Sequence, residues 1–144
     1  MTGLKHIKDM PVSEFRKQAK VIIDGAKDDG YVLLHKMSKA EVCENSITKR
    51  IKKHKLPRMA DVQKIKGLLR EVADMMDKAE KDMVHLIYLA KHCKSLDSEV
   101  IDNCNLIADT FFEQIVGQKK FVDDKLVKCD ATIDLLLAAN AANA

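Results

Sequence analysis

One apolar stripe, which runs from Val62 to Cys93, constrains the fold of this chain more than any other feature. Small or apolar residues recur in it at alternating steps of three and four positions, namely at Val62, Ile65, Leu69, Val72, Met76, Ala79, Met83, Leu86, Ala90 and Cys93. This 3.5-residue period is typical of a long helix that packs against its partners by knobs into holes. A second stripe at Leu68, Met75 and Ile87 widens the apolar face. We therefore expect at least two other helices to cover it.

A second long helix is expected before this stripe. Apolar residues recur there every seven positions, at Val12, Ala19, Ala26, Leu33, Ala40 and Ile47. The spacing continues through the Asp-Asp-Gly sequence that ends at Gly30, which is otherwise typical of a turn. Because a tight turn would interrupt the spacing, we predict one helix from Val12 to the neighbourhood of Lys55. Pro57 follows, and proline disfavours helix in the residue before it.

A third helical segment follows a short connection that ends with Asp97 or Ser98 as the expected N-cap. Its apolar stripe changes phase near Gly117, which predicts a local bend. The stripe positions before and after this point are Ile101, Cys104, Ala108, Phe111 and Ile115, then Val122, Leu126, Cys129, Ile133 and Leu136.

These segments predict an all-α fold. Because their lengths are similar and their connections are short, we expect an antiparallel up-down-up bundle of three long helices with coiled-coil-like packing. The alternative is a four-helix bundle with a break at Gly30. The predicted domain plan is a flexible N-terminal arm at 1–11, a single helical-bundle domain at 12–139 and a frayed Ala/Asn tail at 140–144.

The composition supports a helical chain and disfavours several classes of function. Two prolines, five glycines and no tryptophan leave few residues that favour strands and turns. No apolar run approaches the roughly 18 to 20 residues that span a bilayer, and Met1–Pro11 holds no apolar signal core. We therefore expect a cytoplasmic protein, or a secreted one if its cysteines are paired. Phosphate-binding loops, nucleophile elbows and zinc-type Cys/His spacing are absent, so we expect no enzymatic activity, cofactor or metal.

The clearest surface feature is a run of cations. The chain has no acidic residue between Glu44 and Asp61, although its net charge is only +3. The basic residues that we expect to bind a partner or phosphate are Lys49, Arg50, Lys52, Lys53, Lys55, Arg58, Lys64, Lys66 and Arg70. Such a cluster attracts an acidic protein surface or an anionic membrane. Nucleic acid is disfavoured, because no aromatic residue for base stacking lies between Tyr31 and Tyr88.

Four cysteines occupy positions of the apolar stripes. In an up-down-up bundle, Cys43 lies near the level of Cys129, and Cys93 near the level of Cys104. We interpret all four as free buried thiols in a reducing compartment. Two disulfides, Cys43 with Cys129 and Cys93 with Cys104, are the alternative.

Three leucines, Leu135, Leu136 and Leu137, precede the alanine-rich tail. The predicted topology brings them to the same end of the bundle as the run of cations. There they could dock a partner helix or insert at a membrane surface, but the favoured use is to close the top of the core or to form a contact with a second copy of the chain.

The function expected from these features is that of a non-enzymatic interaction or adaptor module, whose basic tip docks an acidic protein partner. Two alternatives come from other classes. One is a bundle that binds or perturbs anionic membranes, and the other is a secreted or surface protein stapled by disulfides. A homodimer is also compatible with the sequence, because a coiled-coil seam fits a second chain as well as the same one.

Overall fold

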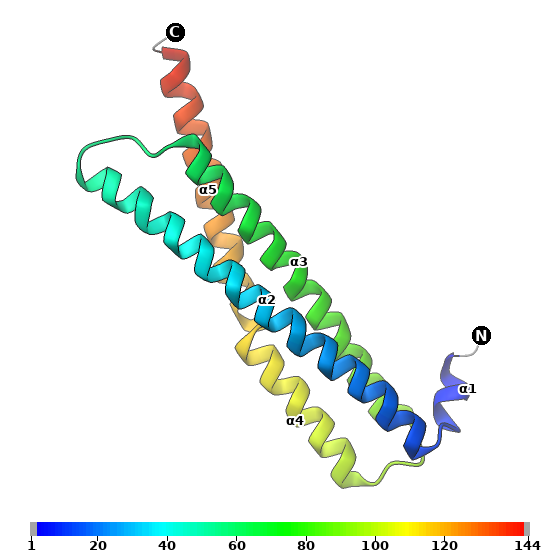
Figure 1. Ribbon diagram of the computed structural model, residues 1–144. Coiled ribbons are helices and arrows are strands. Elements are labelled where there is room, and N and C mark those ends of the chain that lie inside the picture. The colour runs from blue at the N-terminus through cyan, green and yellow to red at the C-terminus, as the bar shows by residue number, and fades with distance from the viewer. Residues whose placement is uncertain (1–2, 143–144) are drawn as a thin grey trace. The chain divides into compact units, whose positions relative to one another are not determined.

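The computed structural model describes residues 3–142, with side chains from His6 onward. Within that range helix is the only regular secondary structure. The elements are α1 (Gly3–Lys8), α2 (Val12–Lys52), α3 (Met59–His92), α4 (Ser98–Gln114), the short 3-10 helix η1 (Val116–Gln118) and α5 (Lys119–Ala142) (Figure 1). Long helices pack against one another, α2 on α3 and α3 on α5, which confirms the predicted all-α helical bundle.

The stripe from Val62 to Cys93 forms the buried side of α3. Each of its positions is at most 3% exposed. The flanking residues Leu68, Met75 and Ile87 are partly buried, and Leu89, which the pattern did not include, is 1% exposed. The predicted seam is therefore confirmed, and the buried face is wider than a two-stranded coiled coil requires.

Helix α2 runs through Gly30 without a break, as the seven-residue spacing predicts. The four-helix alternative with a break at this glycine is therefore not observed. Gly30 is buried, and a Cβ atom at this position would lie 3.1 Å from Cδ1 of Ile115. Because Gly30 has no side chain, Ile115 can pack closely against α2 at this point. The glycine does not introduce a turn in the helix.

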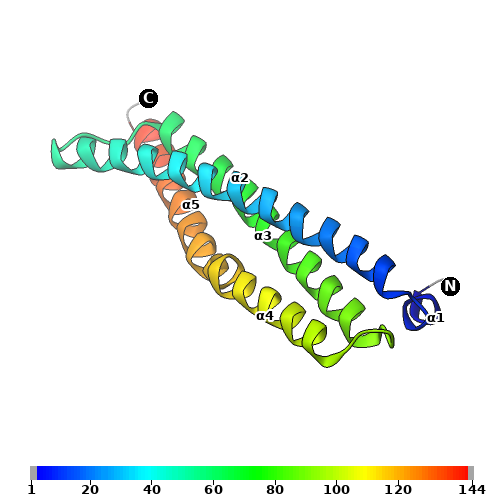
Figure 2. The same cartoon turned by 60° about the horizontal axis from the view of Figure 1, so that its bottom comes forward.

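Contacts divide the described chain into two compact units, and both α2 and α3 contribute to each. Unit 1 combines the residues up to Gly30 with Met76–Gln118, and unit 2 combines Tyr31–Met75 with the residues from Lys119 onward. Within each unit α2 and α3 run antiparallel (Figures 1 and 2). A third helix runs parallel to α2, namely α4 in unit 1 and α5 in unit 2.

The core of unit 1 includes the segment before α2. Met10 is 1% exposed, and its carbonyl accepts hydrogen bonds from the Cys93 thiol at 3.4 Å and from the Ser95 hydroxyl at 2.9 Å. Ile7 of α1 is 8% exposed and joins the same cluster, whose largest fully buried side chain is Phe15. Residues 3–8, which we expected in a flexible arm, thus form a helix. The predicted domain bounds stay a prediction.

The core of unit 2 is built from three helices. Its buried residues are Leu33, Ala40 and Cys43 of α2, Val62, Ile65, Leu69 and Val72 of α3, and Val122, Cys129 and Leu136 of α5. Ion pairs connect the helices at the edges of this core. Lys36 of α2 pairs with Glu71 of α3, and Lys66 of α3 pairs with Asp130 of α5, each at 2.5 Å.

The third predicted helix is divided where its stripe changes phase. α4 ends at Gln114, and η1 separates it from α5, which confirms the predicted irregularity near Gly117. A Cβ atom on Gly117 would lie only 3.0 Å from the carbonyl oxygen of Phe112. At the other end of α4, Asp97 is the N-cap, because its side chain accepts a hydrogen bond from the Val100 amide at 3.0 Å.

Candidate functional site

The basic tip is the connection between α2 and α3 in unit 2, and we define it by Lys49, Arg50, Lys52, Lys53, Lys55 and Arg58. α2 closes there with a Schellman motif. The His54 amide donates to the Ile51 carbonyl at 2.9 Å, and the Lys55 amide donates to the Arg50 carbonyl at 3.0 Å. His54 supplies the left-handed residue of this motif, with φ of 58°. The motif turns the chain sharply and spreads the neighbouring lysines around the helix end.

Two of the nine predicted basic residues are used inside the structure. Nε of Arg50 donates a hydrogen bond to the Leu56 carbonyl at 2.9 Å, which ties the connection to the last turn of α2. Lys66 is partly buried and pairs with Asp130. These two side chains therefore support unit 2, and we do not place them among the residues available to a partner.

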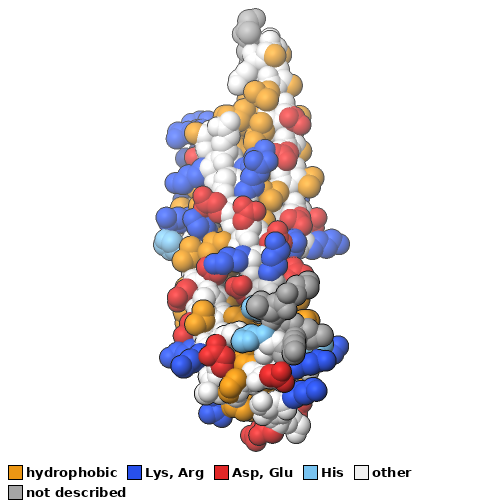
Figure 3. Space-filling model, turned by 90° about the vertical axis from the view of Figure 1, so that its right-hand side faces the viewer, with side chains coloured by type: hydrophobic (Ala, Val, Ile, Leu, Met, Phe, Trp, Pro, Cys, Tyr) orange, Lys and Arg blue, Asp and Glu red, His pale blue; other side chains and the backbone are white. Residues whose placement is uncertain are grey.

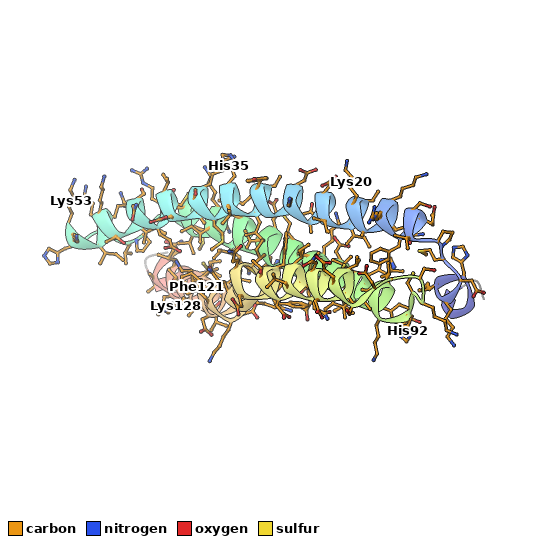
Figure 4. The ribbon with its side chains drawn as sticks, turned by 90° about the horizontal axis from the view of Figure 1, so that it is seen from below. Lys20, His35, Lys53, His92, Phe121 and Lys128 are labelled. Carbon is orange, nitrogen blue, oxygen red and sulfur yellow. The ribbon has the colours of Figure 1, made fainter. Side chains whose placement is uncertain are left out.

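The other seven basic side chains are exposed. They are Lys49, Lys52, Lys53, Lys55 and Arg58 at the tip, and Lys64 and Arg70 farther along α3. Lys53 projects from the end of α2 (Figure 4). Unit 2 as a whole carries 15 Lys and Arg against 9 Asp and Glu, a net charge of +6, whereas unit 1 carries 10 against 13, a net charge of −3. The positive charge of the chain is therefore concentrated in unit 2.

Apolar side chains lie among these cations. Ile51 is 55% exposed and Leu56 is 60% exposed, although both are large hydrophobic residues. The last turns of α5 lie at the same end of unit 2 as the tip (Figures 1 and 2). In the space-filling view, hydrophobic side chains are visible toward the end of the molecule that bears the C-terminus (Figure 3).

The three C-terminal leucines do not form one ridge. Leu136 is 7% exposed and belongs to the core, whereas Leu135 and Leu137 are 72% and 55% exposed. Residues two positions apart on a helix are separated by roughly 200°, so Leu135 and Leu137 point to opposite sides of α5. Only one of them can contact a given flat surface at a time.

All four cysteines are free, buried thiols in this structure, as the sequence predicts, and the alternative disulfide pairing is not seen in it. Burial raises the pKa of Cys104, and the pKa of Cys129 is raised by burial and by the negative charges of Glu44 and Asp130. These thiols therefore stay protonated at neutral pH, and a protonated thiol is a poor nucleophile.

Two hollows lie between α2 and α5 in unit 2, above α3. Glu44 and Lys125 lie in the walls of both hollows. The hollow nearer the tip is about 270 Å³ and is lined by Glu44, Ile47, Thr48, Val62, Ile65, Lys125, Lys128, Cys129 and Thr132. The other is about 330 Å³ and is lined by Leu34, Met37, Ser38, Ala40, Glu41, Glu44, Leu69, Phe121 and Lys125. We call the hollow nearer the tip the α2–α5 groove.

An ion pair marks the inner end of the α2–α5 groove. Nζ of Lys125 donates to both carboxylate oxygens of Glu44, at 2.7 and 2.8 Å, and lies 4.7 Å from the centroid of the Phe121 ring. Lys128 is exposed and lies one turn farther along α5 (Figure 4). Sequence reasoning missed this groove; the signal that could have indicated it is the continuation of the apolar residues of α2 through Ile47 and Ile51 to the end of the helix.

Within the described residues, no group of three His, Cys, Asp or Glu side chains is placed to hold a metal ion. A search of the same residues found no helix both long and apolar enough to cross a bilayer. Comparisons with protein-family models, with curated proteins and with solved structures found no match to this chain.

Proposed function

We propose that this chain is a non-enzymatic interaction module that docks an acidic protein partner at its basic tip. The observation that carries the proposal is the group of five exposed cations around one helix connection, with no acidic residue in the sequence between Glu44 and Asp61. Cations at this density steer a negatively charged surface and speed its association. The neighbouring exposed side chains of Ile51 and Leu56 supply apolar area that a partner can bury.

An anionic membrane is the weaker alternative for the same cations. Shallow insertion at a bilayer requires several apolar side chains on one face. Leu136 belongs to the core, and Leu135 and Leu137 point to opposite sides of α5, so the predicted apolar ridge beside the tip is reduced. A folded acidic partner, in contrast, can be shaped to contact the exposed side chains of Ile51 and Leu56.

The test compares two sets of charge reversals with equal change in net charge. The tip variant replaces Lys49, Lys52, Lys53, Lys55 and Arg58 by Glu. The control variant replaces five exposed basic residues of unit 1 by Glu, namely Arg16, Lys17, Lys20, Lys27 and Lys91. The probes are a fluorescently labelled polyglutamate peptide, vesicles with and without phosphatidylserine, and single-stranded RNA, each measured at low and high salt.

We expect the wild-type chain to bind the peptide with an affinity that falls as salt is added. The tip variant should bind at least tenfold more weakly, whereas the control variant should keep most of the affinity. Equal binding by the tip variant and the wild type would refute the proposal. Tighter binding to anionic vesicles or to RNA than to the peptide would also refute the proposal. It would show that the tip binds a membrane or a nucleic acid instead of an acidic protein.

A further inference from the structure

The α2 stripe continues beyond the part of α2 that the other helices cover. Leu33 and Ala40 are 2% exposed and Cys43 is 8% exposed, but Ile47 is only partly buried and Ile51 is 55% exposed. From Ala40 onward these positions are three, four and four residues apart, so the apolar face of α2 continues to the end of the helix. Over the last turns of α2, the other helices of unit 2 therefore bury the apolar face of this helix only in part.

The α2–α5 groove lies beside this uncovered part of the seam. Its floor is apolar, because it contains Val62 and Ile65 of α3, which are 2% and 3% exposed. The Glu44–Lys125 pair closes its inner end. Toward the tip the wall residue Thr48 is followed one turn later by Lys52, and Ile47 by Ile51. The groove therefore begins in an apolar hollow and leads toward the basic tip.

We propose that the α2–α5 groove binds one amphipathic helix of the partner, with the apolar face of that helix in the groove and its acidic residues at the basic tip and Lys128. This inference rests on the proposed function and names the form of the partner. Three helices that leave a groove between two of them accept a fourth helix in the geometry of a four-helix bundle. From Glu44 to Lys52, α2 extends about 12 Å, which is about two turns of a bound helix.

The positive charge around the groove favours an acidic helix over a second copy of the chain as the molecule bound there. Lys128 is an exposed cation in the α5 wall of the groove, and the tip cations lie at its outer end, whereas Glu44 in the α2 wall is already paired with Lys125. A parallel two-fold dimer through this groove would place two basic tips against each other. Like charges brought together in this way oppose association. An acidic helix meets the same cations with the opposite charge.

The experiment uses three synthetic peptides of about 18 residues. The first has leucines at i, i+3, i+4 and i+7 and glutamates elsewhere; the second has the same composition in scrambled order; the third has lysines in place of the glutamates. Binding is measured by fluorescence anisotropy. We expect the first peptide to bind at least tenfold more tightly than the other two, because only it has both an apolar face and negative charge.

Two variants fill the groove from opposite walls, Thr48→Trp from α2 and Thr132→Trp from α5. Ser46→Trp is the matched control, because Ser46 is an exposed residue of α2 that does not line the groove. Each filling variant should weaken binding of the first peptide at least tenfold, and the control should leave it unchanged. Circular dichroism and the thermal midpoint show whether each variant is folded.

The possible failures point to different errors. If the filling variants bind normally while the tip variant does not, or if the scrambled peptide binds as tightly as the periodic one, the groove inference is wrong and the proposed function stands. If the lysine peptide binds as tightly as the glutamate peptide, the proposed function is wrong as well. A stable dimer that Thr48→Trp and Thr132→Trp dissociate would assign the groove to a second copy and overturn the inference.

Discussion

The carboxylate of Glu44 accepts two hydrogen bonds from Nζ of Lys125, although the two residues are 81 positions apart in the chain. The contact joins α2 to α5, which both pack on α3. Because the side chain of Lys125 is 28% exposed and that of Glu44 is 33% exposed, solvent screens the pair only in part. We infer that this contact helps to fix the width of the groove between the two helices.

A double-mutant cycle tests the contribution of this ion pair. Glu44→Gln and Lys125→Met should each lower the free energy of unfolding, and we expect a coupling energy of about 0.5 to 1 kcal/mol. The measurement is urea denaturation of the wild type, both single variants and the double variant. The coupling should decrease in high salt, and additive effects of the two substitutions would show that the contact contributes nothing.

Two neighbouring leucines of α2 provide a matched test of the core. Leu33 is 2% exposed, whereas Leu34 is 55% exposed. Leu33→Ala should lower the free energy of unfolding by about 2 to 5 kcal/mol, because it leaves a cavity, and Leu34→Ala by about 0.5 kcal/mol. Equal effects in urea denaturation would contradict the assigned face of α2.

The left-handed conformation of His54 predicts a stabilising substitution. At a φ of 58° a residue with a Cβ atom is strained, whereas glycine is not. His54→Gly should therefore raise the free energy of unfolding by about 0.5 to 1 kcal/mol, and His54→Val should lower it, because β-branched residues tolerate this conformation poorly. The thermal midpoints of the two variants should move in opposite directions.

The effect of a glycine-to-alanine substitution inside a helix on the free energy of unfolding should depend on the space around the new Cβ atom. Gly67 lies inside α3, in its third turn, and nothing lies within 4 Å of a Cβ atom built there, so Gly67→Ala should stabilise the protein by about 0.5 to 1 kcal/mol. Gly30→Ala gains the same helix propensity but brings a Cβ atom to 3.1 Å from Ile115. Its gain in urea denaturation should be smaller, and a larger gain than that of Gly67→Ala would show that Ile115 is not packed there.

The buried thiols predict a loss of stability at alkaline pH. Burial raises the pKa of Cys104 and of Cys129, so the folded state holds these protons more tightly than the unfolded state does. The contribution of these two protonated thiols to the free energy of unfolding is complete below the pKa of an unfolded thiol, about 8.5. It is lost as the pH rises through their higher pKa values in the folded state. The free energy of unfolding of a Cys104→Ala/Cys129→Ala variant should fall less steeply than that of the wild type above this pH.

Long-range periodicity predicted the fold well. The stripe on α3 and the seven-residue spacing through Gly30 were correct, because a helix that buries one face over many turns must repeat the pattern in sequence. The irregularity at Gly117 was also readable, since the phase of the stripe changes there. The short helix α1 was missed, because six residues carry too little periodicity to be recognised.

The candidate site was predicted only in part. The run of cations was visible as a composition shift, but the sequence could not separate Arg50, which holds the Leu56 carbonyl, from its exposed neighbours. For the leucine triplet the sequence left a surface contact and a cap on the core both open, and in the structure only Leu136 belongs to the core. Contacts between residues distant in sequence, such as Glu44 with Lys125, leave no local pattern and require the tertiary structure.

The segments of the two units alternate along the chain. The last segment of unit 1 is therefore synthesised before the last segment of unit 2. A nascent chain leaves the ribosome from its N-terminal end. Unit 1 has all its segments once Gln118 has emerged, whereas unit 2 lacks α5 until later, although its first segment, Tyr31–Met75, is made before most of unit 1. Translation therefore presents the basic tip well before the helix that completes the core beneath it.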